Sequence, residues 1–323
     1  MASADTPTAS PPGPGGAAPA PGGAADRTPG AIATLRDGDA LAAIYACTRK
    51  DRLTARTGTP YLALELRDRS GALPARIFRD ADLHAARFER GDLVRVRGRV
   101  ASFRGELQAE LTEIAKAAAT EADPAAFLPA TFRDVEELDG FLEHLAGEVR
   151  QPRYRALLAS VLGDERLRGA LRRWPATRSA HHAYLGGLLE HTVAVATLAV
   201  EACALHPRLD QDLLLTAALV HDLGRTRELE LSAEITLSDE GRMLGHVELG
   251  LRILDEHAAP AGLDDARRLA LAHCVLTHHG AEAAPGRRFA LPEALTLQRL
   301  NALDASVKAA FEHGLGLDVT PPG

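Results

Sequence analysis

The sequence predicts a two-domain protein of mixed α and β class, in which a small barrel of about five strands precedes an all-helical domain. Three observations predict this. The hydrophobic pattern has a period of two up to about residue 116 and a helical period from about residue 134. A length of 323 residues suits two modest domains better than one. The histidines divide in the same way, since 12 of the 13 lie at or after residue 144.

Residues 1–35 are expected to form a disordered tail. Residues 1–30 contain 8 Ala, 7 Pro and 6 Gly, and Met1 carries their one large apolar side chain. Such a segment cannot bury enough apolar surface to offset the entropy lost on ordering. It lacks the continuous apolar core of a signal peptide, and no run in the chain approaches the roughly 20 apolar residues of a membrane span. We therefore expect a cytoplasmic protein with no membrane partner.

Residues 36–120 are expected to form the barrel. Apolar residues alternate along three predicted strands: Leu62, Leu64 and Leu66; Val94, Val96 and Val100; and Leu107, Ala109 and Leu111. Arg95, Arg97 and Arg99 interleave with the valines and therefore share the opposite face of that strand. Turn residues at 57–60, 69–71 and 91–92 separate the strands, and this spacing is typical of a small closed barrel.

The rest of the chain is expected to be helical. A linker and leading helix at 121–150 would precede a helical domain at 151–315, followed by a short C-terminal tail at 316–323. Helical periodicity marks segments near 134–148, 152–173, 187–205, 210–223, 244–258, 264–279 and 293–312, with Pro or Gly between them.

The net charge of −7 is unevenly distributed along the chain. Residues 36–116 have a net charge of +4, whereas residues 117–323 have −10. A mildly basic module beside an acidic, histidine-rich one suggests that one part holds a polyanion and the other cuts it. The three cysteines have no CxxC spacing, which predicts buried reduced thiols rather than a thiolate zinc site.

The candidate metal ligands are histidines and aspartates within or at the ends of predicted helices. They are His191, His221, Asp222, His246, His278, His279 and Asp304. The His221-Asp222 pair ends a segment that is apolar on nearly all sides, where an unpaired charge would cost several kcal/mol. A cation would remove that cost. A carboxylate such as Asp222 can also bridge two ions, which allows hydrolysis at a phosphoryl centre.

The last predicted helix places a further carboxylate in an apolar setting. Asp304 falls within a stripe made by Leu297, Leu300, Val307 and Phe311, although it could instead lie at the edge of a buried face made by Leu300, Leu303 and Val307. Mixed His and Asp ligation without Cys favours Mn, Fe, Mg or Zn over a structural zinc site.

These residues lie in segments that resemble a known superfamily. The segments are HHAYLGGLLEHT (181–192), LVHDLGR (219–225), GRMLGHVELG (241–250), LTHHG (276–280) and PEALTLQRLNALDA (292–305). Their order resembles the HD-domain phosphohydrolases and, more specifically, the YhaM-type 3′→5′ exoribonucleases. YLALELRDRSGALPARIF (61–78) and GDLVRVRGRV (91–100) resemble the OB-fold that precedes the HD domain in that family. The resemblance covers roughly residues 38–312.

The resemblance implies a role for each candidate residue. His191, His221, Asp222 and Asp304 would hold one ion, and Asp222 would bridge to a second. The second ion would be held by His246 and by one of His278 and His279; His278 is preferred because it shares a face with Leu271 and Val275. Mn is the first expectation, with Fe, Mg, Co or Zn as alternatives. Beside Asp222, the catalytic set would include His182 and Arg225, which would approach the substrate phosphate with Gly186-Gly187 and with Arg287 or Arg288.

The chain departs from the family pattern at three places. Arg225 stands where many relatives have Lys; it keeps the charge but cannot readily release a proton. Asn301 stands where relatives often have Asp, and the loop after LTHHG lacks the expected Gly-Ser sequence. The metal ligands are unaffected, so these changes bear on substrate choice.

The implied function is a metal-dependent 3′→5′ exoribonuclease that releases nucleoside monophosphates from single-stranded RNA, with single-stranded DNA as a further candidate. Arg95, Arg97 and Arg99 and the rings Tyr61, Phe78 and Phe103 would hold the strand, unless the arginines form a solvated face and the rings belong to the core. One alternative is a nucleotide or cyclic-dinucleotide phosphohydrolase. Another is a non-catalytic single-strand binder. A homo-oligomer remains open.

Overall fold

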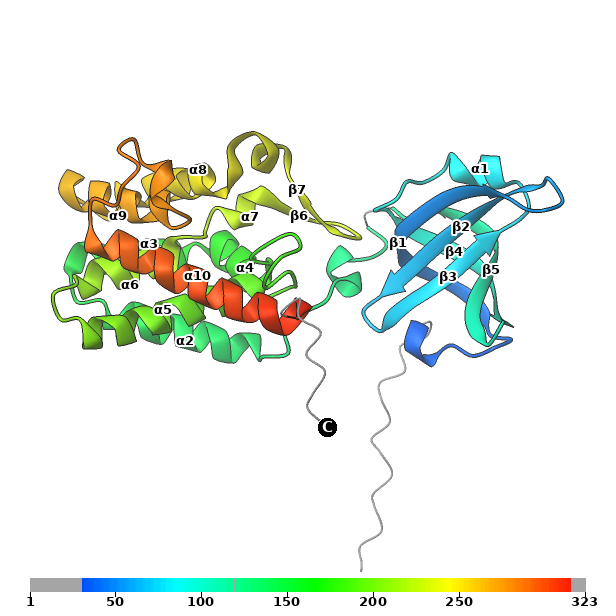
Figure 1. The fold of residues 1–323 in the computed structure, drawn as a ribbon, viewed down its shortest axis with the longest axis horizontal. Helices are drawn as coiled ribbons and strands as arrows, with labels where there is room; N and C mark the ends of the chain where they lie inside the picture. The colour runs from blue at the N-terminus through cyan, green and yellow to red at the C-terminus, as the bar shows by residue number, and fades with distance from the viewer. Residues whose placement is uncertain (1–30, 119, 315–323) are drawn as a thin grey trace, which may run out of the picture.

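The computed structural model describes residues 31–118 and 120–314, which form a β-barrel and a helical domain (Figure 1). The predicted fold class is confirmed. A linker with the 3-10 helix η2 (Pro124–Phe127) joins the two domains. The expected tail lies mostly outside the described residues, as does the expected C-terminal tail; η1 (Ile32–Thr34) is described, and its Ile32 packs on the barrel.

The barrel is a closed sheet with strand order β1-β2-β3-β5-β4. Its strands are β1 (Ala40–Thr54), β2 (Pro60–Asp68), β3 (Gly71–Ile77), β4 (Leu93–Phe103) and β5 (Glu106–Lys116). All neighbours are antiparallel except β3 and β5. The leucines of β2 and the valines of β4 point inward and are buried, as their alternation predicts. A short helix α1 (Ala81–Ala85), which the sequence pattern did not predict, lies between β3 and β4.

The helical domain contains nine α-helices and one small hairpin within the described residues. The helices are α2 (Val135–Glu148), α3 (Pro152–Gly163), α4 (Glu165–Arg173), α5 (Gly187–Leu205), α6 (Gln211–Val220), α7 (Arg225–Glu228), α8 (Asp239–Ala258), α9 (Asp265–Thr277) and α10 (Pro292–His313). The 3-10 helix η3 (Ala281–Ala283) follows α9, and β6 (Leu229–Leu231) pairs with β7 (Ile235–Leu237).

One predicted helix was wrong in its extent. The segment expected as a single helix at 152–173 divides into α3 and α4 at Asp164. The backbone of Asp164 is extended, and its carboxylate accepts from the backbone N–H groups of Arg166 and Leu167 at 3.0 Å. An aspartate that caps the second helix therefore ends the first.

The core of the helical domain is built around α5 and α6. Residues from α2, α3, α9 and α10 pack on these two helices in one apolar cluster. By length and composition alone, α5 could cross a membrane, contrary to the sequence expectation, but 56% of that window is buried inside the fold. The central position of α5 explains its apolar composition and places His191 deep in the domain.

The hairpin β6–β7 touches the barrel. Figure 1 shows it reaching from the helical domain toward β1. Ala233, at the hairpin turn, packs with Ala46 of β1 and Phe127 of the linker. Arg69, at the β2–β3 turn, donates to two linker carbonyls, those of Ala125 at 3.0 Å and Leu128 at 3.3 Å. These contacts hold the barrel beside the helical domain.

Candidate metal centre and nucleic-acid interface

The candidate ligands converge from five helices. His191 lies in the second turn of α5, His221 and Asp222 follow the end of α6, His246 lies within α8, His278 and His279 follow the end of α9, and Asp304 lies in α10. His191, His221, Asp222 and His278 are buried, at 3% exposure or less. The structure thus brings close together all the residues that the sequence pattern predicted as metal ligands.

Asp222 lies at the middle of this cluster. Its Oδ2 is 3.8 Å from Nε2 of His191 and 3.7 Å from Nε2 of His221. Its Oδ1 is 3.4 Å from Nε2 of His278 and 3.5 Å from Nε2 of His246. Each oxygen of one buried carboxylate therefore faces a different pair of imidazole nitrogens.

The opposite nitrogen of each of these rings is anchored by an acceptor. Nδ1 of His221 lies 2.8 Å from the carbonyl of Ala218, and Nδ1 of His278 lies 2.6 Å from that of Val275. Carboxylates hold the other two rings: Asp304 contacts Nδ1 of His191 at 2.6 Å, and Glu228 contacts Nδ1 of His246 at 3.2 Å. An Nδ1 that donates to such an acceptor leaves Nε2 with a lone pair, the arrangement typical of metal-binding histidines.

Several atoms of the cluster lack the partner that a buried polar atom needs. Asp222 Oδ1 and His278 Nε2 are buried without a hydrogen bond among the described residues. Nε2 of His191 and Nε2 of His221 face one another at 3.2 Å, and both Nδ1 atoms already have acceptors. Two facing lone pairs repel unless a cation lies between them. The donor set therefore fits a divalent metal ion, which accepts imidazole nitrogens and carboxylate oxygens together.

Electrostatics keep the cluster ready for a cation. Burial lowers the pKa of His221 to about 3, so its imidazole is neutral near pH 7. Burial alone would raise the pKa of Asp222, but the guanidinium of Arg225 and the surrounding imidazoles hold it well below its ordinary value. Neutral imidazoles and an ionised carboxylate are the protonation states that bind a metal.

The pair that the sequence left unresolved contributes two nitrogens. Asp222, His246, His278 and His279 offer ligand atoms that all lie within 4.8 Å of one another. Nε2 of His279 is 2.8 Å from Nε2 of His246. His278 is buried and faces Asp222, whereas His279 is exposed and faces His246. Both rings therefore lie on the Oδ1 side of Asp222, with His246, and this group is here called the second half of the cluster; His191 and His221, on the Oδ2 side, form the first half.

Asp304 lies behind His191. Its Oδ2 contacts Nδ1 of His191 at 2.6 Å and Nε2 of His182 at 3.0 Å. The apolar stripe predicted for α10 is buried only in its first part: Leu297 is buried, but Val307 is 47% exposed and Phe311 is 84% exposed. The polar contacts with the two imidazoles, rather than apolar packing, therefore bring Asp304 to the inner side of α10.

His182 is part of the packed framework. It is 1% exposed and has a positive φ of 50°. Its Nδ1 lies 3.0 Å from the hydroxyl of Tyr184, which donates to Glu190 at 3.0 Å. Gly187 packs on the backbone of His182 so closely that a Cβ at Gly187 would overlap it. In this conformation, His182 links Asp304 to a hydrogen-bond network in place of facing open space.

Glu228 is a site residue that sequence reasoning missed. It is 7% exposed, and its Oε1 accepts from the backbone N–H of His246 at 3.1 Å. Its Oε2 accepts from Arg225 at 2.6 Å, and Arg225 Nε lies 3.4 Å from Asp222 Oδ1. Burial would raise the pKa of Glu228, but bonding to His246 and the charge of Arg225 lower it to about 2. One carboxylate thus holds both the predicted catalytic arginine and a ligand histidine.

The two halves of the cluster meet at Gly224. A Cβ at Gly224 would overlap the carbonyl oxygen of His246 and the backbone nitrogen of Gly250. Only a residue without a side chain lets the backbone after Asp222 lie against α8. This contact fixes how closely His246 approaches Asp222.

His181 is a second residue that the sequence hypothesis left without a role. Its ring centroid is 5.3 Å from that of His191, and His181, His182 and His191 form a further group able to hold a metal. Its Nδ1 is buried without a partner among the described residues, and burial lowers its pKa to about 4. The adjacent His-His pair was the available signal.

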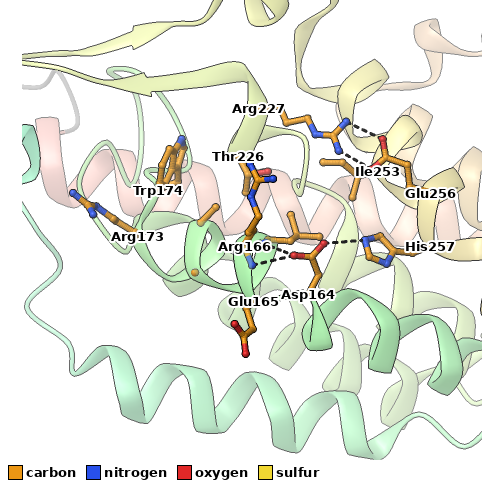
Figure 2. Close-up of a pocket in the computed structure, with 13 residues that line it drawn as sticks. Asp164, Glu165, Arg166, Arg173, Trp174, Thr226, Arg227, Ile253, Glu256 and His257 are labelled. Carbon is orange, nitrogen blue, oxygen red and sulfur yellow. Dashed lines mark hydrogen bonds and ion pairs between the residues drawn. The ribbon is translucent and has the colours of Figure 1, made fainter. Parts of the chain in front are cut away.

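A cavity of about 680 Å³ lies in the helical domain (Figure 2). It is lined by α4, α7 and α8 and includes none of the candidate ligands. Arg227 pairs with Glu256 across it at 2.6 Å, and Asp164 lies 3.9 Å from His257. Four of the charged or titratable side chains that line it are therefore engaged with one another.

The predicted arginine face of the barrel is engaged with the protein itself. Arg95 pairs with Glu121, and Arg97 lies 3.8 Å from Glu113. Arg99 donates to the carbonyl of Gly38 at 3.1 Å. All three side chains are outward and exposed. A nucleic acid that bound here would have to compete with these neighbours.

A cluster of rings and arginines forms elsewhere on the barrel. Tyr61 stacks on Phe78 with centroids 5.4 Å apart, and Phe78 and Phe103 are 46% and 50% exposed. The guanidinium of Arg76 lies 5.9 Å from the ring of Tyr61 and 5.5 Å from that of Phe103. Arg104 lies 5.4 Å from Phe103. These five residues, here called the ring cluster, combine exposed π faces with positive charge.

Family models match both domains. The model described as an HD domain matches residues 188–307, and the model described as an OB-fold nucleic acid binding domain matches residues 47–117. A third model, with the description "putative helicase", matches residues 164–209. The first two cover the metal cluster and most of the barrel, respectively.

Curated relatives cover both domains in a single alignment. A protein named 3′-5′ exoribonuclease YhaM from Halalkalibacterium halodurans is 26% identical over 272 residues, which is 84% of each chain. Its namesake from Bacillus velezensis is 29% identical over 255 residues, covering 78% of this chain and 81% of the relative. Alignments of this length exceed either domain alone. The chain is therefore similar, over both of its domains, to proteins named 3′-5′ exoribonuclease YhaM. In this chain the candidate ligands lie within the HD-domain match, and the barrel that precedes them lies within the OB-fold match.

Likeness to solved structures is weaker. A chain from a replication protein A heterotrimer bound to ssDNA aligns with 28% of this chain and 66% of its own length, with 18% identity and a TM-score of 0.23.

Proposed function

We propose that this protein is a metal-dependent 3′→5′ exoribonuclease that releases nucleoside monophosphates from single-stranded RNA. Relatives named for that activity align over both domains. The single observation that carries the proposal is the position of Asp222, each of whose oxygens faces a different pair of imidazole nitrogens. A buried carboxylate with this geometry is suited to bridging two divalent ions, as in two-metal phosphodiester hydrolysis.

The protein's own groups prepare the centre for this chemistry. His191 and His221 present Nε2 to one oxygen of Asp222, and the other oxygen faces the second pair. Divalent ions at such a site supply Lewis acidity to a phosphoryl oxygen and lower the pKa of water. The positive charge of Arg225 lies beside Asp222 and would help neutralise the scissile phosphate. We propose Mn²⁺ as the first metal to test, followed by Fe²⁺, Mg²⁺, Co²⁺ and Zn²⁺.

Asp304 has two candidate roles at the first ion: direct coordination, or orientation of His191. Its carboxylate already touches His191, the ring that presents Nε2 to Asp222. To coordinate the same ion directly, it would have to turn away from Nδ1 of His191. In its present position it sets the orientation of that ring, which is a common second role for a carboxylate at a metal site.

The barrel would hold the single strand. We propose that the ring cluster stacks bases, because its rings are exposed and its arginines lie over them. Arg95, Arg97 and Arg99 would contribute long-range attraction to phosphate, since each also has a partner in the protein. Single-stranded DNA offers the same bases and charges, so it is a second substrate to test.

The test is direct. The purified protein is incubated with Mn²⁺ and 5′-labelled RNA or DNA oligomers, with EDTA and the variant Asp222→Ala as controls. The expected result is a ladder that shortens from the 3′ end, with release of nucleoside 5′-monophosphate. A 3′-phosphate or a 3′ duplex should block the reaction, because an exonuclease must place a free end beside the metals.

The alternative functions give different outcomes. A nucleotide or cyclic-dinucleotide phosphohydrolase would cleave those small substrates while leaving RNA at full length. A strand binder without catalysis would retain the oligomer in a gel and release no monophosphate with any of the metals. Either outcome would refute the exoribonuclease proposal.

A further inference from the structure

A cavity of about 850 Å³ lies between the barrel and the helical domain. Its lining includes outer residues of β2, the linker at 127–129, the loop residues 178, 179 and 183, hairpin β6–β7 and the start of α8. In Figure 1 the hairpin and the linker both extend to the barrel, so the cavity lies where the domains meet. Its volume is within the range of about 300–1,000 Å³ that is typical of ligand pockets.

Two of the four arginines that line this interdomain cavity are held by neighbours. Arg90 pairs with Glu234 at 3.3 Å. Arg242 donates to the carbonyl of Leu237 at 2.6 Å and pairs with Asp239. Glu65, the other acidic residue of the lining, accepts from a threonine hydroxyl at 2.6 Å. These contacts neutralise or satisfy most of the charge in the cavity.

The other two arginines have no such partner. The side chains of Arg67 and Arg178 are exposed and form no hydrogen bond or ion pair with any residue in the described ranges. Arg67 belongs to the barrel, and Arg178 belongs to the helical domain. Two free guanidiniums from different domains therefore line one cavity, and guanidinium is the side chain best suited to binding phosphate oxygens.

The barrel side of the cavity shares the outer face of β2 with Tyr61 of the ring cluster. Tyr61, Ala63, Glu65 and Arg67 alternate with the buried leucines of β2, so all four share its outer face. Arg67 lies six residues after Tyr61 along the strand, a distance of about 20 Å at 3.3 Å per residue. A strand that stacks on Tyr61 could therefore follow β2 into the cavity.

The helical-domain side leads to the metal cluster. Arg178 lies three residues before His181, in the loop that also carries His182 to Asp304. Arg242 lies four residues before His246 in α8, and the non-helical Gly245 (φ 71°, ψ 163°) kinks the helix between them. The walls that line the cavity on this side are thus the segments that carry residues of the metal cluster.

We propose that the interdomain cavity holds the phosphodiester backbone of single-stranded RNA on its way from the ring cluster to the metal centre. Arg67 and Arg178 neutralise successive phosphates along this path. The proposal deepens the proposed exoribonuclease function and depends on it. It also sets a polarity: Arg178, on the metal side, contacts a phosphate nearer the 3′ end than the one that Arg67 contacts.

The first experiment reverses the two free charges in the full-length protein. Arg67→Glu and Arg178→Glu are compared with Arg208→Glu, an exposed residue in the loop after α5 with no partner in the described ranges. The 19 residues of α5 separate Arg208 from the 178–186 loop by about 28 Å. RNA affinity is measured in EDTA to prevent cleavage. Each lost phosphate contact should weaken binding about fivefold at 0.1 M salt and reduce the log–log salt slope by about 0.7.

The second experiment locates the contacts on the RNA. Single neutral methylphosphonate linkages are placed one at a time along a 3′-hydroxyl oligomer, and binding is measured for the parent, Arg67→Gln and Arg178→Gln. A linkage that faces an arginine should weaken binding to the parent but not to the variant that lacks that arginine. The linkage coupled to Arg178 should lie closer to the 3′ end than the linkage coupled to Arg67.

The outcomes separate this proposal from the proposed function. If the parent shortens RNA while Arg67→Glu and Arg178→Glu bind it as tightly as Arg208→Glu does, the cavity is not the path and the exonuclease proposal stands. Coupling in the reverse order would also overturn the path. If the parent cleaves a small phosphodiester such as bis(p-nitrophenyl) phosphate but neither binds nor shortens RNA, the exoribonuclease function fails, and the path fails with it.

Discussion

Replacement of Glu228 should show how much metal affinity depends on a residue that supports the candidate ligands without being one of them. Glu228 is not placed among the ligands, yet it contacts the imidazole and backbone of His246 and the guanidinium of Arg225. In Glu228→Ala, His246 loses the acceptor that fixes which nitrogen carries the proton. Arg225, whose side chain is 13% exposed, loses its shortest ion pair beside Asp222. We expect weaker metal binding in a protein that keeps every ligand.

The size of the effect follows from these contacts. Loss of a carboxylate that orients a ligand histidine typically weakens metal affinity by about 10–100-fold, or about 1.4–2.7 kcal/mol. Removal of one partner from a buried ion pair costs about 3–5 kcal/mol of stability, because the other charge is left behind. Glu228→Gln keeps an acceptor oxygen and the side-chain volume, so it should fall between Glu228→Ala and the parent in both measurements.

The assay is a titration of metal-free protein with Mn²⁺ by calorimetry, together with chemical unfolding of the same samples. Glu240→Gln is the matched control, since Glu240 is an exposed glutamate in the first turn of α8, the helix that carries His246. Retention of parental Mn²⁺ affinity, within about twofold, by a folded Glu228→Ala would refute this reasoning. Lower stability with unchanged affinity would limit Glu228 to a structural role.

Three further predictions follow from the site. Asp222→Ala should abolish RNA hydrolysis in a gel assay yet keep RNA affinity within about threefold, because the barrel holds the strand; hydrolysis at a tenth of the parental rate would contradict the bridging role. Phe78→Ala with Phe103→Ala should weaken RNA binding by about 1–3 kcal/mol per lost stack, and parental affinity in a filter-binding assay would exclude the ring cluster. Because the pKa of His221 is about 3 when folded and near 6.5 when unfolded, the unfolded chain binds the extra proton, so the metal-free protein should lose up to about 1.4 kcal/mol of stability per pH unit as pH falls from about 6.5 to 5. Denaturant titrations at several pH values give the free energy of unfolding as a function of pH. In His221→Asn this free energy should change less per pH unit than in the parent, by about that amount, and an equal change would argue against a neutral buried imidazole.

Much of the fold could be predicted because its signals are local. The alternation of the leucines in β2 and the apolar composition of α6 each depend on a few neighbouring residues. The candidate ligands could be proposed because each lies in a short motif with a known order, and the structure brings these residues close together. Capping is local as well, but a single capping residue is easily missed. Asp164 interrupts two helices whose hydrophobic patterns follow one another closely, so the segment 152–173 was predicted as one helix.

The parts that could not be predicted depend on pairs that are distant in sequence. Glu228 supports His246 across 18 residues, because α7 packs on α8 through the contact at Gly224. Arg95 pairs with Glu121, which lies beyond the strand in the linker, so the valine pattern of β4 carried no sign of it. The strands of β6–β7 have three residues each, too few for a period to appear.

The contact at Gly224 has a consequence for how such a centre can change over evolutionary time. The separation between its two halves is set where the backbone after Asp222 touches α8, and no ligand side chain takes part in that contact. Individual ligands can therefore be exchanged, and the preferred metal with them, while the spacing stays the same. The converse also holds: a single methyl group at Gly224 would push the halves apart with every ligand still in place. The protein would then keep its full set of ligands and lose the distance at which they act together.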